Sequence, residues 1–420
     1  LLNLDVNVFS YESLRVTMAK GDDGGWSGFA HREGRTLMRL PNEPRGEVQG
    51  PRAKGSDPVF YNPAMTGSRT RSVLLLRHAI EKGILGEGVI YALDGLSASG
   101  LRARRWLNEL PPEMAERISA TIVDLDQTAL AWATASHEEY PPAHEQGELV
   151  PVQGDLRGVV LNSGRHWVDI DPYGSPLPFL DTALQSLARS SVIEVSATDT
   201  AALTGSSKRP LLRRYGARVR TDCLAHDSGL RVLLAVVART AAKHDRMIEP
   251  LISIWDSHHL RVSARVMKSV EGANAVESRI GWRVHSPTEE EVSASAASNL
   301  HHGDSFEQMP MSCLLPIDYP LNRNDARVSG PLWVAAMGDA SAMSSMTTER
   351  ALEFCGPEDD DDDPLGWGPR DFEQERKRVA RSVRNISEEA GVIDAHPHIV
   401  VDDLASWLGI GAPPSPSKMV

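Results

Sequence analysis

One short stretch, residues 167–181, constrains the fold and the chemistry of the chain more than any other. It begins with an apolar run around one acid and continues as Asp171-Pro172-Tyr173-Gly174-Ser175-Pro176. An apolar run that ends in Pro and Gly is typical of a buried parallel strand leaving its sheet through a rigid turn. Ligands of open α/β sheets bind beyond the carboxyl ends of such strands, so this turn is a candidate ligand site.

The residue types in the turn suit the binding of a planar amine. Asp171 can accept hydrogens from an exocyclic amine, and Tyr173 can stack on the ring that carries it. Pro172 fixes the backbone between them and removes a competing N–H donor. These three residues are the candidate catalytic residues of an amino-methyltransferase that aims the amine at a methyl sulfonium. The alternative is a tight strand-to-helix turn in which Asp171 only caps the next helix.

Three predicted strands upstream of the turn also end in acids. They cover residues 89–94, 119–123 and 149–152, and the acids at or just beyond their ends are Asp94, Asp124 and Asp155. A carboxylate after the second strand of a nucleotide-binding unit commonly holds ribose hydroxyls, and Asp155 can accept from an adenine amine. Each acid alone is as readily a helix cap. Together they predict a doubly wound α/β sheet that binds an adenosine-bearing cofactor across its carboxyl edge.

The turn after the first of these strands consists mostly of small residues, Gly95-Leu96-Ser97-Ala98-Ser99-Gly100, and a predicted helix containing Arg102 follows it. Small residues at such a turn let the backbone approach a ligand and present helix N–H groups to it. The spacing is not the G-x-G-x-x-G fingerprint of dinucleotide-binding proteins, and the chain has no P-loop.

The region after the Asp-Pro-Tyr turn predicts a helix over residues 177–188 and a strand over residues 192–198 that ends at Asp199. Residues 203–220 are rich in Gly, Ser and Arg, and we expect them to form a loop. A long basic loop near an active edge suits the binding of an RNA backbone, through residues such as Arg213 and Arg214. A surface loop without function is the alternative.

Composition excludes several other classes of protein. A formal net charge of −13 argues against a surface coated in positive charge for non-specific nucleic-acid binding, although local arginine clusters remain compatible with it. The sequence has no apolar run long enough to span a membrane. The three cysteines are far apart, and the neighbouring His258 and His259 point to opposite sides of an extended chain, so we expect no metal site. Scattered cysteines also favour a reducing cytoplasmic location.

Shifts in composition divide the chain into three parts. Residues 1–57 predict an irregular, partly β lead-in, residues 58–271 a catalytic domain, and residues 272–420 a smaller α+β C-terminal domain. Within the last part, residues 289–299 are predicted as a loop or insertion. The acidic run at residues 358–363 is predicted as a disordered linker.

These motifs, taken in order, resemble those of the archaeal and eukaryotic tRNA (guanine(26)-N2)-dimethyltransferase family. The similarity covers most of residues 58–270, and its most specific blocks are Asp169-x-Asp171-Pro-aromatic-Gly-Ser-Pro and Ala197-Thr198-Asp199-Thr200-Ala201. The resemblance implies a class I, Rossmann-like methyltransferase sheet that uses S-adenosyl-L-methionine, and a C-terminal domain that docks tRNA. It also implies transfer of one or two methyl groups to N2 of guanine 26, which must first be exposed or flipped.

By motif match, the resemblance implies cofactor contacts at Arg69, Arg102, Asp124 and Asp155, and a catalytic acid at Asp171. Asp94 joins the cofactor-binding group through the series of strand-end acids. Asp199, Arg213 and Arg214 are the candidate tRNA-binding residues. Two other functions remain open: methylation of another base amine, such as adenine N6, and non-catalytic RNA binding by a protein that keeps the fold.

Overall fold

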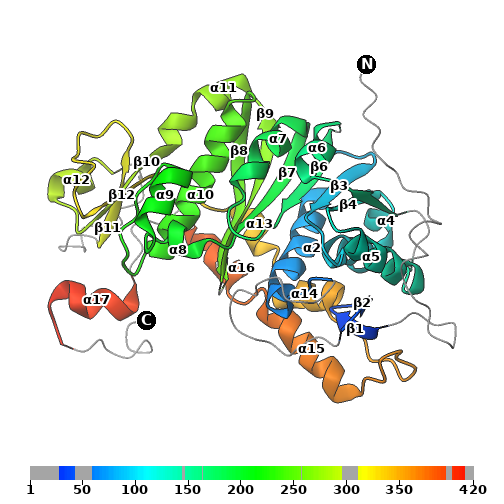
Figure 1. Cartoon of the computed structure of the whole chain (residues 1–420). Coiled ribbons are helices and arrows are strands. Elements are labelled where there is room, and N and C mark those ends of the chain that lie inside the picture. The colour runs from blue at the N-terminus through cyan, green and yellow to red at the C-terminus, as the bar shows by residue number, and fades with distance from the viewer. Residues whose placement is uncertain are drawn as a thin grey trace.

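A seven-stranded sheet forms the centre of the protein, in the strand order β5-β4-β3-β6-β7-β9-β8 (Figure 1). The computed structural model describes residues 28–42, 59–143, 147–162, 164–256, 258–295, 311–393 and 400–411. Five strands are parallel: β3 (Ile90–Gly95), β4 (Ile118–Asp124), β5 (Glu148–Gln153), β6 (Arg165–Ile170) and β7 (Leu187–Ala197). The antiparallel pair β8 (Arg246–Asp256) and β9 (His259–Lys268) completes one edge.

The sequence order of the strands reverses between β3 and β6, which pair although β4 and β5 lie between them in the chain. A reversal of this kind opens a crevice at the carboxyl ends of the two strands. The predicted α/β class and doubly wound sheet are therefore confirmed. The predicted strand ends at Asp94, Asp124 and the Asp-Pro-Tyr turn all lie at this edge.

Alternating residues of the central strands build two hydrophobic cores, one on each face of the sheet. Ala92 and Trp167 belong to the core with α2 (Thr66–Glu81) and α3 (Leu101–Glu109). Leu93 and Val168 belong to the opposite core. That second core also contains residues of α7 (Leu177–Ser186), α10 (Ala225–Ala242) and α6 (Leu156–Val159). Strands covered on both faces are apolar almost throughout, which explains the continuous apolar runs in the sequence.

A short hairpin of β1 (Phe29–Glu33) and β2 (Thr36–Leu40) packs on α3 and on α5 (Gln127–Glu139). Gly34 in its turn has a φ of +60°, and a Cβ there would lie 2.4 Å from an oxygen of Glu109. Only glycine fits this combination of backbone angle and contact. The tight turn places the neighbouring Glu33 in the protein interior.

A second sheet, in the order β11-β10-β12, lies beyond the central one (Figure 1). Its strands are β10 (Ile280–His285), β11 (Ser312–Pro316) and β12 (Val328–Trp333). Leu314, Leu332 and Trp333 join the core that contains α10, so the small sheet packs against the part of the chain that holds the central sheet. The short helix α12 (Glu289–Ser293) packs on β11, whereas α11 (Val270–Asn274) packs on α10 and β8.

Four helices after the second sheet return to the central sheet. They are α13 (Ala340–Ser344), α14 (Thr348–Cys355), α15 (Pro369–Arg381) and α16 (Ile386–Glu389), and α17 (Val401–Leu408) follows later in the chain. Helices α14 and α15 pack on α2, and the Gly34 N–H donates to Glu375 of α15 at 2.8 Å. Helices α14 and α15 therefore hold α2 and, through Glu375, the turn of the first hairpin in place.

Three predicted segments differ from the structure. Residues 203–220 are not a loop throughout, because α8 (Thr200–Leu203) ends at Leu203 and α9 (Lys208–Tyr215) lies within the segment, where Leu211 and Tyr215 lie one turn apart and are both buried. Residues 289–293 form α12, whose start carries a capping box between Thr288 and Glu291; residues 296–299 lie outside the described residues. The acidic run at 358–363 is not a free linker, since Asp363 is buried and its carboxylate accepts from Arg32.

No helix in the described part of the chain is both long and apolar enough to cross a membrane. Within the same residues, no group of three or more His, Cys, Asp or Glu side chains is placed to hold a metal ion. The three cysteines are free thiols.

Candidate active site

A cavity of about 420 Å³ lies at the carboxyl ends of β3, β4 and β6, at the point where the strand order reverses. Parallel strands end at one edge of their sheet, so acids at those ends converge. The cavity is lined by seven of the residues predicted for the site: Arg69, Asp94, Arg102, Asp124, Asp171, Pro172 and Tyr173. The structure therefore brings together most of the predicted cofactor-binding residues and all of the predicted catalytic ones.

The turn between β3 and α3 forms one wall of the cavity. Leu96 and Ala98 adopt positive φ angles of 64° and 47°, which non-glycine residues rarely do and which cost on the order of 1–3 kcal/mol each. Asp124 holds this backbone in place, because its carboxylate accepts from the Ala98 N–H at 2.9 Å. The Ser97 hydroxyl lines the same wall, is buried, and has no hydrogen-bond partner within the described chain. An unpartnered buried hydroxyl facing a cavity fits a ligand atom.

Asp94 lies deeper in the cavity wall and is almost fully buried. Burial raises the pKa of Asp94 to about 8, although the nearby Arg102 acts in the opposite direction. Its carboxylate accepts from the Ala103 backbone N–H at 3.3 Å. A carboxyl group in this state is protonated at neutral pH and can donate a hydrogen bond.

Asp171 has the opposite character. Burial acts to raise its pKa, but Arg102 and Arg261 outweigh burial and hold the pKa of Asp171 below the ordinary value. A guanidinium N–H of Arg102 donates to the Asp171 carboxylate at 2.7 Å. Asp171 is therefore an ionised acceptor at neutral pH, which is the state that binds the hydrogens of an amine.

A layer of buried charged side chains lies within the sheet, next to the turn that carries Asp171. Arg261 of β9 donates to Asp169 of β6 and lies 2.9 Å from a carboxylate oxygen of Glu194 of β7. All three side chains are buried, and they join three neighbouring strands of the sheet. Buried charges persist only when they are paired, so this layer fixes the position of the charge beneath the turn.

The Asp-Pro-Tyr turn itself is locked to the end of β7. The Gly174 N–H donates to the Thr198 hydroxyl at 2.6 Å, and the Thr198 N–H donates to the Gly174 carbonyl at 2.9 Å. Tyr173 is 56% exposed, and its ring meets Phe60 edge to face at a centroid distance of 4.9 Å. The turn thus presents an aromatic face at the mouth of the cavity, next to Asp171.

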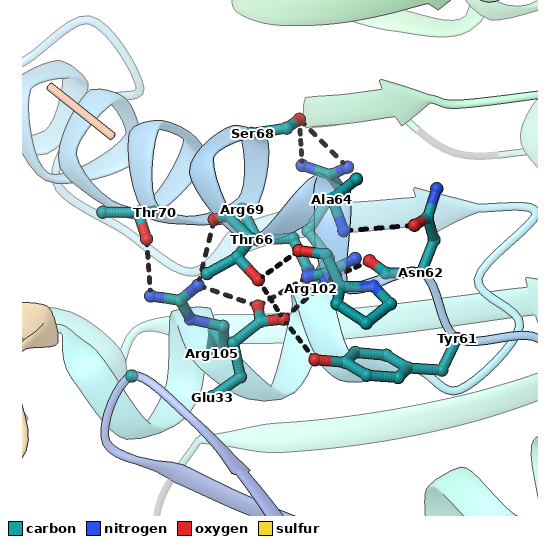
Figure 2. Close-up of polar contacts among 12 residues, drawn as sticks. Glu33, Tyr61, Asn62, Ala64, Thr66, Ser68, Arg69, Thr70, Arg102 and Arg105 are labelled. Atoms are coloured by element: carbon teal, nitrogen blue, oxygen red, sulfur yellow. Dashed lines mark hydrogen bonds and ion pairs between the residues drawn. The ribbon is translucent and has the colours of Figure 1, made fainter. Parts of the chain in front are cut away.

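Arg69 enters the cavity from the first turn of α2 and is held by a residue that the sequence did not single out. Figure 2 shows the carboxylate of Glu33 between the guanidinium groups of Arg69 and Arg105. Arg69 donates to both oxygens of Glu33, at 2.6 and 2.5 Å, and Arg105 donates at 3.0 Å. The hydroxyls of Tyr61 and Thr66 donate to the same carboxylate, at 3.0 and 2.9 Å.

Asp155 does not line the cavity. Its carboxylate caps α6 by accepting from the Arg157 N–H at 2.9 Å, and it pairs with the Arg157 guanidinium at 2.5 Å. The reason lies in the strand order, because β5 is the edge strand and β4 separates it from β3. The structural alternative considered for each acid, a helix cap, describes Asp155.

The predicted tRNA-binding residues lie beside the cavity rather than in it. Asp199 pairs with Arg214 at 3.0 Å and accepts from the Tyr215 hydroxyl at 2.8 Å. The Tyr215 hydroxyl also lies 2.9 Å from the Ser175 hydroxyl, so α9 is tied to the Asp-Pro-Tyr turn. Arg213 is exposed on α9.

Sequence reasoning missed several residues of the site. Phe60, Asn62, Asp126, Phe179 and His258 also line the cavity. Phe60 and Asn62 fall in a segment whose aromatic and turn residues were apparent, but nothing local tied that segment to the sheet edge. For Glu33 the only signal was a charged residue beside a glycine in a short apolar hairpin.

Comparisons with known proteins agree with this geometry. The model of a family described as N2,N2-dimethylguanosine tRNA methyltransferase matches residues 42–416. A curated tRNA (guanine(26)-N(2))-dimethyltransferase from Pyrobaculum calidifontis is 31% identical over 321 residues, 76% of each chain. One of the same name from Thermococcus kodakarensis is 34% identical over 300 residues, 69% of this chain and 70% of the relative.

A solved structure shares the fold over nearly the whole chain. Trm1 from Pyrococcus horikoshii, in complex with S-adenosyl-L-methionine, superimposes with a TM-score of 0.63 at 22% sequence identity. The match covers 91% of both chains. It therefore extends over the central sheet and the C-terminal region alike.

Proposed function

Because the chain belongs to the N2,N2-dimethylguanosine tRNA methyltransferase family, we propose that it transfers one or two methyl groups from S-adenosyl-L-methionine to N2 of guanine 26 in tRNA. The observation that carries this proposal is the ionised Asp171 beside the solvent-exposed ring of Tyr173. Both lie at the mouth of a cavity that has further acids in its walls. Asp171 can accept hydrogen bonds from the amine of a planar base while Tyr173 stacks on the face of the same base.

The residues of the cavity fit an adenosine-bearing cofactor. Asp124 is the last residue of the second strand of the parallel unit, where ribose hydroxyls are commonly held, and Asp94 is a neutral carboxyl that can donate to a hydroxyl. The unpartnered hydroxyl of Ser97 adds a further polar atom. When bound, S-adenosyl-L-methionine supplies an electrophilic methyl group. Arg69 and Arg102 face Glu33 and Asp171, so we propose that they shape the cofactor site through those carboxylates.

The proposed role of Asp171 is to orient the amine and to receive its proton. Its ionised carboxylate accepts one amine N–H, which aims the nitrogen lone pair away from the carboxylate and into the cavity. Tyr173 stacks on the guanine ring, and Pro172 keeps the acid and the ring at a fixed spacing. A methylated aromatic amine that still carries its extra proton is a strong acid, so even a carboxylate of low pKa can take that proton.

We propose tRNA as the partner and α9 as part of its binding surface. Arg213 and Arg214 are exposed there, and Asp199 and Tyr215 hold the helix against the turn that carries Asp171. A backbone contact on this helix would position the substrate without reading its sequence. Asp155 has no part in the proposal because it faces Arg157 outside the cavity.

The same proposal assigns a role to each of the three parts of the chain. Residues 58–271 carry the catalytic site, residues 272–420 help to dock tRNA, and residues 1–57 form a lead-in whose hairpin holds Arg69 through Glu33. We also propose that the protein works in the cytoplasm, where its three free thiols stay reduced.

The test is methyl transfer from labelled S-adenosyl-L-methionine to unmodified tRNA transcripts that carry either guanine or adenine at position 26. We expect label on the guanine transcript alone, and a loss of at least about 100-fold in Asp171→Asn. Asp181→Asn on α7 is the matched control, because it removes an acid outside the cavity. Equal label on both transcripts would disprove the site, and full activity of Asp171→Asn would disprove the role of the acid. No label on either would disprove the function.

A further inference from the structure

A second hollow, which we call the arginine groove, lies next to the cavity. Its volume is about 580 Å³, and it is lined by the start of α2, the end of β8, the end of α15 and α16. The short 3-10 turn η1 (Pro63–Met65) separates the two hollows, because Pro63 and Ala64 line the groove and Met65 lines the cavity. A molecule that fills the cavity and extends past η1 therefore reaches the groove.

The groove is basic although the chain as a whole is acidic. Four arginines line it, Arg71, Arg378, Arg381 and Arg384, against the two acids Asp256 and Glu389. Arg71 is neutralised by Asp256 at 2.5 Å, and Arg378 donates to Glu375 at 3.1 Å.

Arg381 and Arg384 are different. Both are exposed, and no carboxylate among the described residues lies within ion-pair distance of either. Although acids outnumber basic residues 57 to 44 in this chain, neither of these two arginines is paired with an acid among the described residues. Both guanidinium groups are therefore available to an anion from outside. The planar fork of a guanidinium suits phosphate oxygens.

An aromatic platform lies in the same groove. Trp255, near the end of β8, lines it and is 49% exposed. The ring of His226 stacks behind the indole, with centroids 3.8 Å apart and planes inclined by 21°. Burial lowers the pKa of His226, so the supporting ring is uncharged at neutral pH. A rigid, half-exposed indole offers one flat face to an incoming ring.

We infer that the arginine groove binds the tRNA strand next to the target nucleotide, with Arg381 and Arg384 on phosphates and Trp255 under an unstacked base. The inference rests on the proposed function. A base that leaves its stack to enter the cavity pulls the neighbouring nucleotides out of regular geometry, and those nucleotides then need a surface of their own. Cations for the backbone combined with an aromatic face for the base are how proteins bind single-stranded nucleic acid. An acidic protein segment would use the arginines but would leave the indole unexplained.

The test measures the affinity of the full chain for an unmodified tRNA transcript over a range of salt concentrations. Arg381→Ala/Arg384→Ala should weaken binding at least about tenfold at about 0.1 M salt and lower the salt slope by about 1.4 to 1.8, because two phosphate contacts are lost. Trp255→Ala should weaken binding about fivefold or more without changing the slope, and Trp255→Phe should recover most of the loss.

The matched control is Arg370→Ala/Lys243→Ala, which removes the same charge from exposed positions outside the groove lining. It should bind tRNA as the unaltered chain does, and every variant should bind S-adenosyl-L-methionine with unchanged affinity. Melting temperatures of all variants check that they remain folded.

The outcomes separate this inference from the proposed function. Groove variants that bind tRNA with the affinity and salt slope of an active unaltered chain overturn the inference alone, and an acidic protein would then be the occupant to examine. An unaltered chain that binds tRNA through the groove but transfers no methyl group overturns the proposed function alone. A chain that does not bind tRNA overturns both.

Discussion

Replacing Glu33 by Gln tests how the first hairpin supports the cavity. The Glu33 carboxylate is completely buried and accepts from Arg69, Arg105, Tyr61 and Thr66. Glutamine keeps one acceptor oxygen, but it removes the negative charge and turns an N–H donor toward the arginines. Removing one partner of a buried ion pair costs about 3–5 kcal/mol of unfolding free energy, because the remaining charge stays buried.

The structure indicates a value near the lower end of that range. Arg105 keeps a second carboxylate, that of Glu109 at 2.7 Å. Among the described residues, Arg69 keeps only the Asn62 carbonyl at 3.0 Å and the face of the Tyr61 ring. We therefore expect a loss of about 3 kcal/mol, which is large against a typical total stability of about 5–15 kcal/mol.

The pH dependence follows from the sign of the pKa shift. Burial acts to raise the pKa of Glu33, but Arg69 outweighs it and holds the pKa well below the ordinary value of 4.5. A depressed carboxylate pKa contributes stability in full above the unfolded-state value, and that contribution is lost as the pH falls below it. The difference between the unaltered chain and Glu33→Gln should thus be constant between about pH 6 and 8 and shrink below about pH 4.

The assay is denaturant unfolding followed by tryptophan fluorescence, together with calorimetric titration of S-adenosyl-L-methionine. Glu109→Gln is the matched control, because Glu109 is equally buried and also pairs with Arg105 but does not contact Arg69. Both variants should lose stability, and only Glu33→Gln should bind the cofactor more weakly, since Arg69 lines the cavity. Unchanged stability of Glu33→Gln would refute the energetic reasoning. Equal cofactor affinity in the two variants would refute the positioning role.

Three further predictions follow from the same geometry. Tyr173→Ala should weaken tRNA binding about tenfold through lost stacking while Tyr173→Phe keeps it; equal losses in binding assays would assign the effect to the hydroxyl. Burial lowers the pKa of His31 to about 4, so the unfolded chain takes up the proton first and stability should fall by about 1.4 kcal/mol per pH unit from about pH 6.5 to 4. His31→Gln should remove that part of the slope in unfolding curves, and an unaltered slope would contradict the assignment. Asp363→Asn should cost about 3 kcal/mol because Arg32 loses its carboxylate, whereas exposed Asp361→Asn should cost little; similar unfolding midpoints for both would show that the Arg32 pair is not buried in solution.

The part of the site that could be predicted is the part that parallel strands place by rule. Asp94, Asp124 and Asp171 end strands of one parallel sheet, so their convergence follows once the strands are recognised. Asp155 satisfies the same local pattern, but its strand lies at the sheet edge. Asp155 lies outside the cavity because its strand is far from the point where the strand order reverses, and not because of its residue type.

The rest depends on contacts between segments that are far apart in the chain. Glu33 and Arg69 meet because the hairpin packs against α3 and α5, and no local pattern specifies that packing. The helix α9 was hidden for a different reason. Its two buried residues, Leu211 and Tyr215, lie one turn apart, but the surrounding Gly, Ser and Arg outweigh that short signal in a composition-based prediction.

Opposite protonation states within one cavity explain how a single sheet edge can distinguish its two ligands. Asp171 faces two arginines and stays charged, so it can only accept hydrogen bonds. Burial raises the pKa of Asp94 to about 8, so at neutral pH its carboxyl can also donate. Under the proposed function, the mouth of the cavity selects a group that brings N–H donors, such as the N2 amine of guanine. We propose that the wall, through Asp94, satisfies a ribose hydroxyl of the cofactor in either direction. Such a division of pKa values between neighbouring carboxyls is how one site assigns different roles to the same residue type.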